Sequence, residues 1–154
     1  MARDFKFRLQ PVLDIREGAE QKAKEQLAET MALRAQGREQ LRAAERLVAE
    51  ADAAARDAAG LPLTIDQLAA QQRWRERLER HRLAAGQQLV EAEGEVVLSR
   101  SALVEAHQRR ATLDRLKDTK AAQHRADRER IDAVEADEIA LRQHHGRKRH
   151  RTAS

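Results

Sequence analysis

One stretch of this chain, Gly60 to Gln67, combines the residues that stop one helix and start another. Gly60 suits the left-handed conformation that follows a helix C-terminus, and Pro62 cannot continue a helix. Thr64 and Gln67 have the spacing of a capping box, in which each side chain bonds the backbone N–H of the other residue. Because no similar cluster of helix breakers occurs after the first dozen residues, the sequence predicts two long helices joined at one corner.

The composition indicates helices that meet along a thin seam instead of surrounding a thick core. Of the 154 residues, 36% are charged and 2% are aromatic, the latter being Phe5, Phe7 and Trp74. Much of the apolar share is alanine, and this mixture with helical periodicity is typical of coiled coils. The expected fold is all-α: a long antiparallel two-helix coiled coil, or α-hairpin, in which the second helix is longer and overhangs the first.

The first half of the chain carries an imperfect seam, mostly of small and apolar residues, at alternating spacings of four and three. From Leu13 these positions are Arg16, Glu20, Ala23, Leu27, Thr30, Arg34, Gly37, Leu41, Ala44, Val48, Ala51, Ala55 and Ala58. Ala19 and Met31 lie beside the seam. We therefore expect a local drift or stutter between residues 16 and 34.

The second half carries a cleaner heptad pattern, sustained over five repeats. Its positions are Leu78, Arg82, Ala85, Leu89, Ala92, Val96, Ser99, Leu103, Ala106, Arg110 and Leu113. The pattern fails beyond Leu116, and apolar residues return only weakly at Ile131, Val134, Ile139 and Leu141.

Counting outward from the corner predicts where the second helix loses its partner. In an antiparallel hairpin that turns near residue 62, Leu13 faces the neighbourhood of residue 111 and Leu9 that of residue 115. The first helix therefore ends where the second heptad fails. The last 25 or so residues of the second helix are then a candidate binding element or, alternatively, a frayed solvated end. We expect one hairpin over residues 1–145, with helix 1 at about 11–59, a turn at 60–65, helix 2 at about 66–144, and a basic flexible tail at 146–154.

The charge distribution argues against a nucleic-acid groove, although the pI is near 9.9. Residues 1–60 carry 11 Lys/Arg and 11 Asp/Glu, and residues 61–143 carry 15 of each. The net charge of +4 therefore lies in the last eleven residues. A nucleic-acid binder that uses the tail from Arg147 to Arg151 is an alternative, but the balanced hairpin makes us expect no nucleic acid.

Catalytic and metal sites are not expected. The chain has no cysteine and no phosphate-binding glycine loop, and a two-helix rod has no pocket deep enough to desolvate a nucleophile. His144, His145 and His150 could hold a metal, but we interpret them as part of a flexible end. No apolar run reaches the length of a membrane span and no signal peptide precedes the first helix, so we expect a cytoplasmic protein without cofactor or membrane insertion.

Two surface features have alternative interpretations. Arginines recur at every fourth position of the first helix, at Arg34, Arg38, Arg42 and Arg46. This stripe either pairs with acids of the second helix such as Glu91, or docks an acidic partner. Trp74 is either a packing wedge against the first helix near residue 50 or an exposed anchor for a partner.

The two ends of the chain resemble a known family. The opening from Phe5 to Glu17, which reads Phe-Lys-Phe-Arg-Leu-Gln-Pro-Val-Leu-Asp-Ile-Arg-Glu, resembles the start of the FliJ family of flagellar type III export proteins. The segments 113–118 and 137–142 resemble that family's C-terminal half. The likeness covers nearly the whole chain in the same order.

This resemblance implies a non-enzymatic component of the flagellar type III protein export apparatus. In that family an antiparallel coiled coil acts like the central stalk of a rotary ATPase. It promotes assembly and activity of the hexameric export ATPase ring, contacts the cytoplasmic domain of the membrane-embedded export gate and escorts export chaperones. The resemblance thus implies a role in flagellum biogenesis and motility, at the inner face of the cell membrane.

The resemblance also assigns two groups of residues. The end that bears both termini would enter the ring, through Phe5, Phe7, Leu9, Leu116, Ile131, Val134 and Leu141. The half nearer the corner would contact the gate, through Gln40, Leu47, Trp74 and Leu78. Ala44 and Ala51 stand where that gate surface would have larger residues.

Two other functions are compatible with the hairpin. The first is the equivalent stalk of a virulence-type injectisome, which shares the hairpin but less of the opening around Phe5 and Phe7. The second is a structural coiled coil that self-associates side by side. Self-association predicts a second apolar stripe, for which Ala19 and Met31 are the support.

Overall fold

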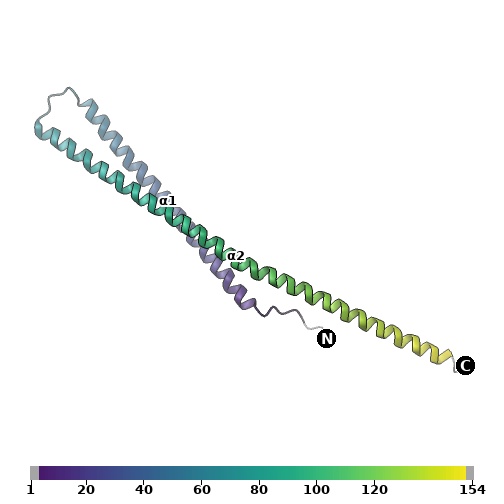
Figure 1. Cartoon of the computed structure of the whole chain (residues 1–154). Coiled ribbons are helices and arrows are strands. Elements are labelled where there is room, and N and C mark those ends of the chain that lie inside the picture. Colours follow the sequence, from purple (N-terminus) through teal and green to yellow (C-terminus); the bar gives the residue numbers. More distant parts are fainter. Residues whose placement is uncertain (1–3, 152–154) are drawn as a thin grey trace. The chain divides into compact units, whose positions relative to one another are not determined.

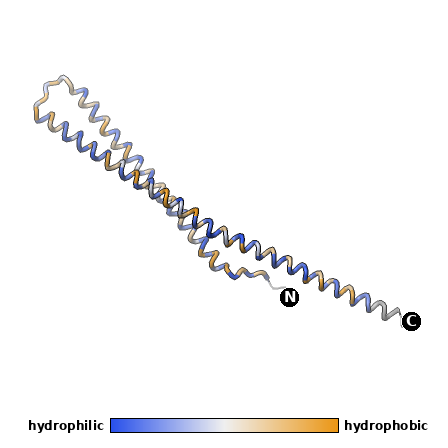
Figure 2. The backbone as a smooth tube through the Cα atoms, in the orientation of Figure 1, coloured by the Kyte–Doolittle hydropathy of each residue, from blue (hydrophilic) through white to orange (hydrophobic). Residues whose placement is uncertain are grey.

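The computed structural model of the chain describes the backbone of residues 4–151 and the side chains of residues 4–145. Two helices make up nearly all of this part: α1 (Gln10–Asp57) and α2 (Ile65–Arg151) (Figure 1). They pack against each other as an α-hairpin, which confirms the predicted all-α fold. Figure 2 shows apolar residues spaced out between polar ones along both helices, as a seam requires.

The corner has the predicted local structure. Gly60 has a φ of 98°, and the Leu61 N–H donates to the Ala58 carbonyl at 3.1 Å. The capping box is complete, because the Thr64 N–H donates to Gln67 Oε1 at 2.9 Å and the Gln67 N–H donates to Thr64 Oγ1 at 3.3 Å. The turn occupies residues 58–64, so it begins two residues before the predicted turn.

Contacts divide the chain into two compact units, and the first of these, Gly18–His107, contains the corner. Here every predicted seam position from Glu20 to Ala55 on α1 and from Leu78 to Ala106 on α2 is buried or half-buried, as is Ala58 in the turn. Val96 is 2% exposed and Ala44 is 1% exposed. Gly37 lies in this seam, where a Cβ would meet Leu89 at 3.6 Å.

The expected stutter near residues 16 to 34 is not present. Ala19 and Met31 are exposed, while Glu20, Ala23, Leu27, Thr30 and Arg34 are buried or half-buried at unbroken four-three spacing. Polar residues thus hold seam positions that the hydropathy pattern alone does not mark.

The second unit consists of residues 1–17 and 108–154, of which the described part begins at residue 4. Leu13, in the first turns of α1, is 2% exposed. Residues 4–9 precede the helix as a non-helical arm, and the Phe5 ring lies 5.7 Å from the His124 ring. Phe5 and Phe7 are both half-buried.

This arm corrects the predicted end of the covered part of α2. Half-buried residues continue past Leu116 at Lys117, Ala121, His124 and Arg128, whereas every side chain from 129 to 145 is exposed. The prediction that α2 loses its partner near residue 116 is therefore wrong by about three helical turns. The arm extends the covered part of α2, because Phe5 precedes the first residue of α1 and its ring lies against His124.

The C-terminal end of α2 also differs from the expected bounds. The helix continues to Arg151 instead of ending near residue 144. The predicted basic tail falls on residues 146–154, whose side chains lie outside the described part, and it stays a prediction.

Candidate functional site

The two flanks of the seam in the corner unit can be told apart by one ion pair. Arg38 of α1 follows a seam position by one residue, as does Glu93 of α2, and their Nη2 and Oε1 atoms lie 3.4 Å apart. We call this flank the Arg38 side. Residues that precede a seam position by one lie on the opposite flank, because successive residues on a helix are separated by about 100°.

Three of the four residues assigned to gate contact lie on that opposite flank, here named the Trp74 side. Gln40 and Leu47 precede the seam positions Leu41 and Val48, and both are exposed. Trp74 lies one heptad before His81, which precedes the seam residue Arg82 in the same way. The structure therefore brings Gln40, Leu47 and Trp74 to one side of the corner unit.

Leu78, the fourth of these residues, is 6% exposed. It belongs to the seam and contacts α1, so a partner cannot reach it while the hairpin is closed. Leu78 was predicted to contact the gate directly, but it is the first strong seam position of α2 and is therefore buried. Leu78 can affect the Trp74 side only indirectly, through the packing of α2 on α1.

Trp74 is not a packing wedge, since 49% of its surface is exposed. The guanidinium carbon of Arg77 lies 5.3 Å from the centre of its ring, within the range of a cation–π contact. The Arg77 guanidinium therefore lies over the ring while about half of the Trp74 surface stays accessible. This is the arrangement expected of an exposed anchor.

The arginine stripe on α1 does not form one docking face. Arg38 pairs with an acid of α2, but the acid is Glu93 and not Glu91. Arg42 pairs within its own helix, with Glu39 at 2.7 Å. Arg34 is half-buried in the seam, where its Nε atom has no hydrogen-bond partner. Within the described part of the chain Arg46 has no ion pair.

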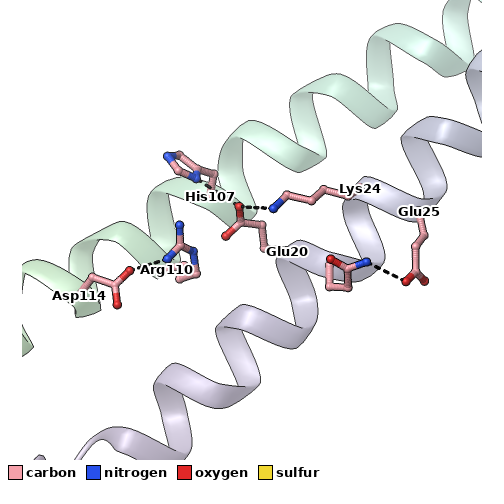
Figure 3. A network of polar contacts seen from close by, with 7 residues as sticks. Glu20, Lys24, Glu25, His107, Arg110 and Asp114 are labelled. Carbon is pink, nitrogen blue, oxygen red and sulfur yellow. Dashed lines mark hydrogen bonds and ion pairs between the residues drawn. The ribbon is translucent and has the colours of Figure 1, made fainter.

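A buried carboxylate fixes the register of the corner unit near its far end. The Glu20 side chain is 6% exposed and accepts from Lys24 Nζ at 3.2 Å and pairs with His107 Nδ1 at 3.3 Å (Figure 3). A buried charge is tolerated only where partners compensate its desolvation. The sequence placed Glu20 in the seam, but the pairing with His107 follows from the register and was missed.

The terminal unit presents an uncovered helical segment. Ile131, Val134 and Leu141 are 57%, 58% and 59% exposed, and their spacing of three and seven places them on one face. Between residues 131 and 141 the chain carries four acids and no base, namely Asp132, Glu135, Asp137 and Glu138. This segment is thus an apolar strip on an acidic helix.

The remaining residues that were assigned to contact with the ATPase ring are partly buried within the chain. Phe5 and Phe7 are half-buried, Phe5 against His124. Leu9 and Leu116 are 39% and 37% exposed. Phe5 thus lies against α2 and Leu116 belongs to α2, whereas Ile131, Val134 and Leu141 are exposed.

The described residues contain neither a metal-binding cluster nor a membrane-spanning helix. No group of three or more His, Cys, Asp or Glu there is arranged to hold a metal ion, and the His150 side chain lies outside this part. Over their described residues, neither helix has a segment apolar enough to span a bilayer. The groove beside Leu78 on the corner unit is open to solvent.

Comparisons with known proteins agree with the sequence resemblance. A search of curated proteins gave no match, and neither did a search of solved structures. The family model described as "Flagellar FliJ protein" matches residues 5–149, nearly the whole chain. With its two-helix coiled coil and this match over residues 5–149, the chain belongs to the FliJ family of flagellar export proteins.

Proposed function

We propose that this chain acts as a central-stalk-like activator of the hexameric flagellar export ATPase. Membership of the FliJ family makes it a component of the flagellar export apparatus, and the family is a structural one without a known enzyme activity. The observation that carries the finer proposal is the segment 129–145, every side chain of which is exposed within the described part of the chain.

The composition of this segment suits a ring interior. A charged helix without an intramolecular partner is stabilised by a surface that covers it. Ile131, Val134 and Leu141 offer a narrow apolar strip for that surface. The four acids between them predict that the ring presents basic residues to the segment. The arm with Phe5 and Phe7 steadies the preceding turns of α2.

The Trp74 side is proposed to contact the cytoplasmic domain of the export gate. Gln40, Leu47 and Trp74 are exposed on this flank, and a half-exposed Trp is a common centre of an interface. Because these residues lie in the corner unit and the open segment lies in the terminal unit, the two activities are separable. An escort role toward export chaperones follows from the family alone, and we assign it no residues.

The same proposal puts the protein in the cytoplasm, at the inner face of the cell membrane, through its partners and without insertion into the bilayer. Nucleic acid is not among the proposed partners. The family match favours the flagellar system over the injectisome, because the matched family is described as flagellar.

ATPase stimulation tests this proposal. The cognate export ATPase is mixed with the full chain, and hydrolysis rate and ring formation are measured. The triple variant Ile131→Ala, Val134→Ala, Leu141→Ala is expected to lose stimulation by about tenfold, as removal of a small hot-spot cluster does. Ile139→Ala is the matched control, because Ile139 is 55% exposed in the same segment but lies on another face.

A second experiment tests the gate surface separately from the ATPase surface. Trp74→Ala is expected to weaken binding to the gate's cytoplasmic domain by about tenfold or more while leaving ATPase stimulation intact. If the triple variant stimulates as well as the parent, the stalk proposal is wrong. If Trp74→Ala lowers both activities equally, the two-surface division is wrong.

A further inference from the structure

The face of α2 that is turned away from α1 carries a second seam. Leu83, Val90, Val97 and Val104 follow one another at intervals of seven, and they are 56%, 68%, 65% and 55% exposed. Gln87, Gly94 and Ser101 stand between them, which gives the alternating four-three spacing of a coiled coil. The seam spans 22 residues, or roughly 32 Å of helix.

The absence of charge from this seam is unexpected for a solvent-facing helix surface. The chain as a whole is 36% charged, yet none of the seven seam positions is. The seam is bounded by Glu76 and Arg80 at one end. Outward-facing positions of a two-helix coiled coil normally carry charged residues.

Packing within the chain does not explain why valine and glycine occupy positions in this seam. Valine is a weak helix former, and three exposed valines lower helix stability without an internal contact to offset the loss. Gly94 in the seam and Gly86 beside it also weaken the helix, and a Cβ added at either would meet nothing within 4 Å. A helix surface that is apolar, β-branched and small suits close approach by another helix.

The charges around the seam decide what kind of helix fits. A groove on the Arg38 side is lined by Leu83, Gly86 and Val90 together with Glu45 and Glu91. Arg82 also lines this groove, but it pairs with Glu79 at 2.7 Å. Glu79, and then Glu45, raise the pKa of the Arg82 guanidinium. The groove is therefore acidic after internal pairing.

A second copy of the chain is a poor occupant for this reason. The middle of the seam, between Val90 and Val97, is flanked by Glu91 on one side and by Glu93, which pairs with Arg38, on the other. An antiparallel copy that pairs Val90 with Val97 of its partner would set these acids against the same acids. Like charges brought together in an interface disfavour it.

We propose that the second seam, Leu83 to Val104, docks an amphipathic helix of a partner protein whose apolar stripe is flanked by lysine or arginine. This surface lies on α2 away from the Trp74 side. It is therefore separate from the proposed gate surface, and its test does not depend on ATPase stimulation.

Designed peptides test the proposal on the full chain. One 24-residue helical peptide carries Leu at its a and d positions and Lys at e and g, and its twin carries Glu in place of Lys. The basic peptide is expected to bind at least tenfold more tightly than the acidic twin, as measured by fluorescence anisotropy at low and moderate salt. Equal binding of the two peptides would overturn the charge assignment.

Substitutions locate the bound peptide. The double variant Val90→Asn, Val97→Asn removes apolar surface without adding charge and is expected to weaken binding of the basic peptide at least tenfold. Leu33→Asn is the matched control, because Leu33 is 53% exposed on the Trp74 side of α1. Thermal unfolding followed by circular dichroism checks that both variants fold. Undiminished binding by the double variant would overturn the proposal.

The lack of cysteine allows a second readout. An environment-sensitive fluorophore on Ser101→Cys is expected to shift to the blue when the basic peptide is added, whereas the same label on Leu33→Cys is not. Analytical ultracentrifugation of the unlabelled chain tests whether a second copy of the chain binds the seam instead. A concentration-dependent dimer that the double Asn variant abolishes would show that the seam binds a second copy, and would overturn the proposal.

Discussion

α2 belongs to both units, and the two units differ in how much of its surface is covered. In the corner unit, residues 18–107, it has a helical partner throughout the heptad, with Leu78, Ala85 and Val96 buried. In the terminal unit it is covered first by the start of α1 and then by the non-helical arm, and among the described residues every side chain from 129 to 145 is exposed.

This difference separates two tasks in a single helix. The corner unit has the features that fix a register, namely continuous seam burial and the Glu20–His107 pair. The terminal unit keeps a helical segment uncovered, and helices without packing partners are the parts that open most readily. A structural element and a binding element thus share one helix and differ in what covers it.

The largest expected contrast is between two neighbouring valines of the corner unit. Val96 is 2% exposed, whereas Val97 is 65% exposed. Val96→Asp buries an unpaired charge and is expected to lower the free energy of unfolding by about 3 kcal/mol or more. Val97→Asp should change it by no more than about 0.5 kcal/mol. Urea unfolding followed by circular dichroism measures both, and similar losses would mean that the seam is not where the structure has it.

A smaller effect is expected from the arm of the terminal unit. The double variant Phe5→Ala, Phe7→Ala removes two half-buried rings and should weaken local stability of α2 around residues 117–128 by about 1 to 2 kcal/mol. Hydrogen exchange of those residues is expected to accelerate, while exchange of residues 78–106 stays unchanged. Ile15→Ala, at a side chain that is 68% exposed, is the control and should change neither.

If the double variant leaves exchange at 117–128 unaltered, the arm does not protect α2. Faster exchange in both regions would instead mean that the arm stabilises the whole hairpin. Either result would remove the distinction between the arm-covered turns and the corner unit.

The smallest effects concern two glycines of the corner unit, with opposite signs. Gly60→Ala is expected to destabilise by about 1 kcal/mol, because Gly60 has a positive φ of 98°. Gly37→Ala is expected to stabilise by up to about 1 kcal/mol, since a Cβ there meets Leu89 at an ordinary contact distance of 3.6 Å. Thermal midpoints that move in the same direction would contradict one of these two local geometries.

The features that follow from chain-local chemistry were predictable from the sequence. Gly60, Thr64 and Gln67 specify the corner through backbone conformation and capping, and both are present as expected. The four-three spacing found the seam even where Glu20 and Thr30 interrupt its hydropathy. Helical periodicity is therefore enough to identify which face of each helix is buried.

What escaped prediction depends on contacts that have no helical period. The arm at Phe5 and Phe7 packs as non-helical chain, so counting heptads outward from the corner could not extend coverage to Arg128. Leu78 was assigned to a partner surface by resemblance, although its burial follows from its seam position. The second seam from Leu83 to Val104 could not be predicted from the heptad alone, because the first seam of α2 already accounts for its packing against α1.

Hydrogen exchange on the chain with and without its cognate export ATPase tests most directly the claim that the terminal unit is the open binding element. In the free chain, residues 129–145 are expected to exchange at nearly unprotected rates and residues 78–106 slowly. Adding the ATPase should protect 129–145 and leave 78–106 unchanged. Protection that is absent from 129–145, or that appears only around Gln40, Leu47 and Trp74, would contradict this division of the molecule.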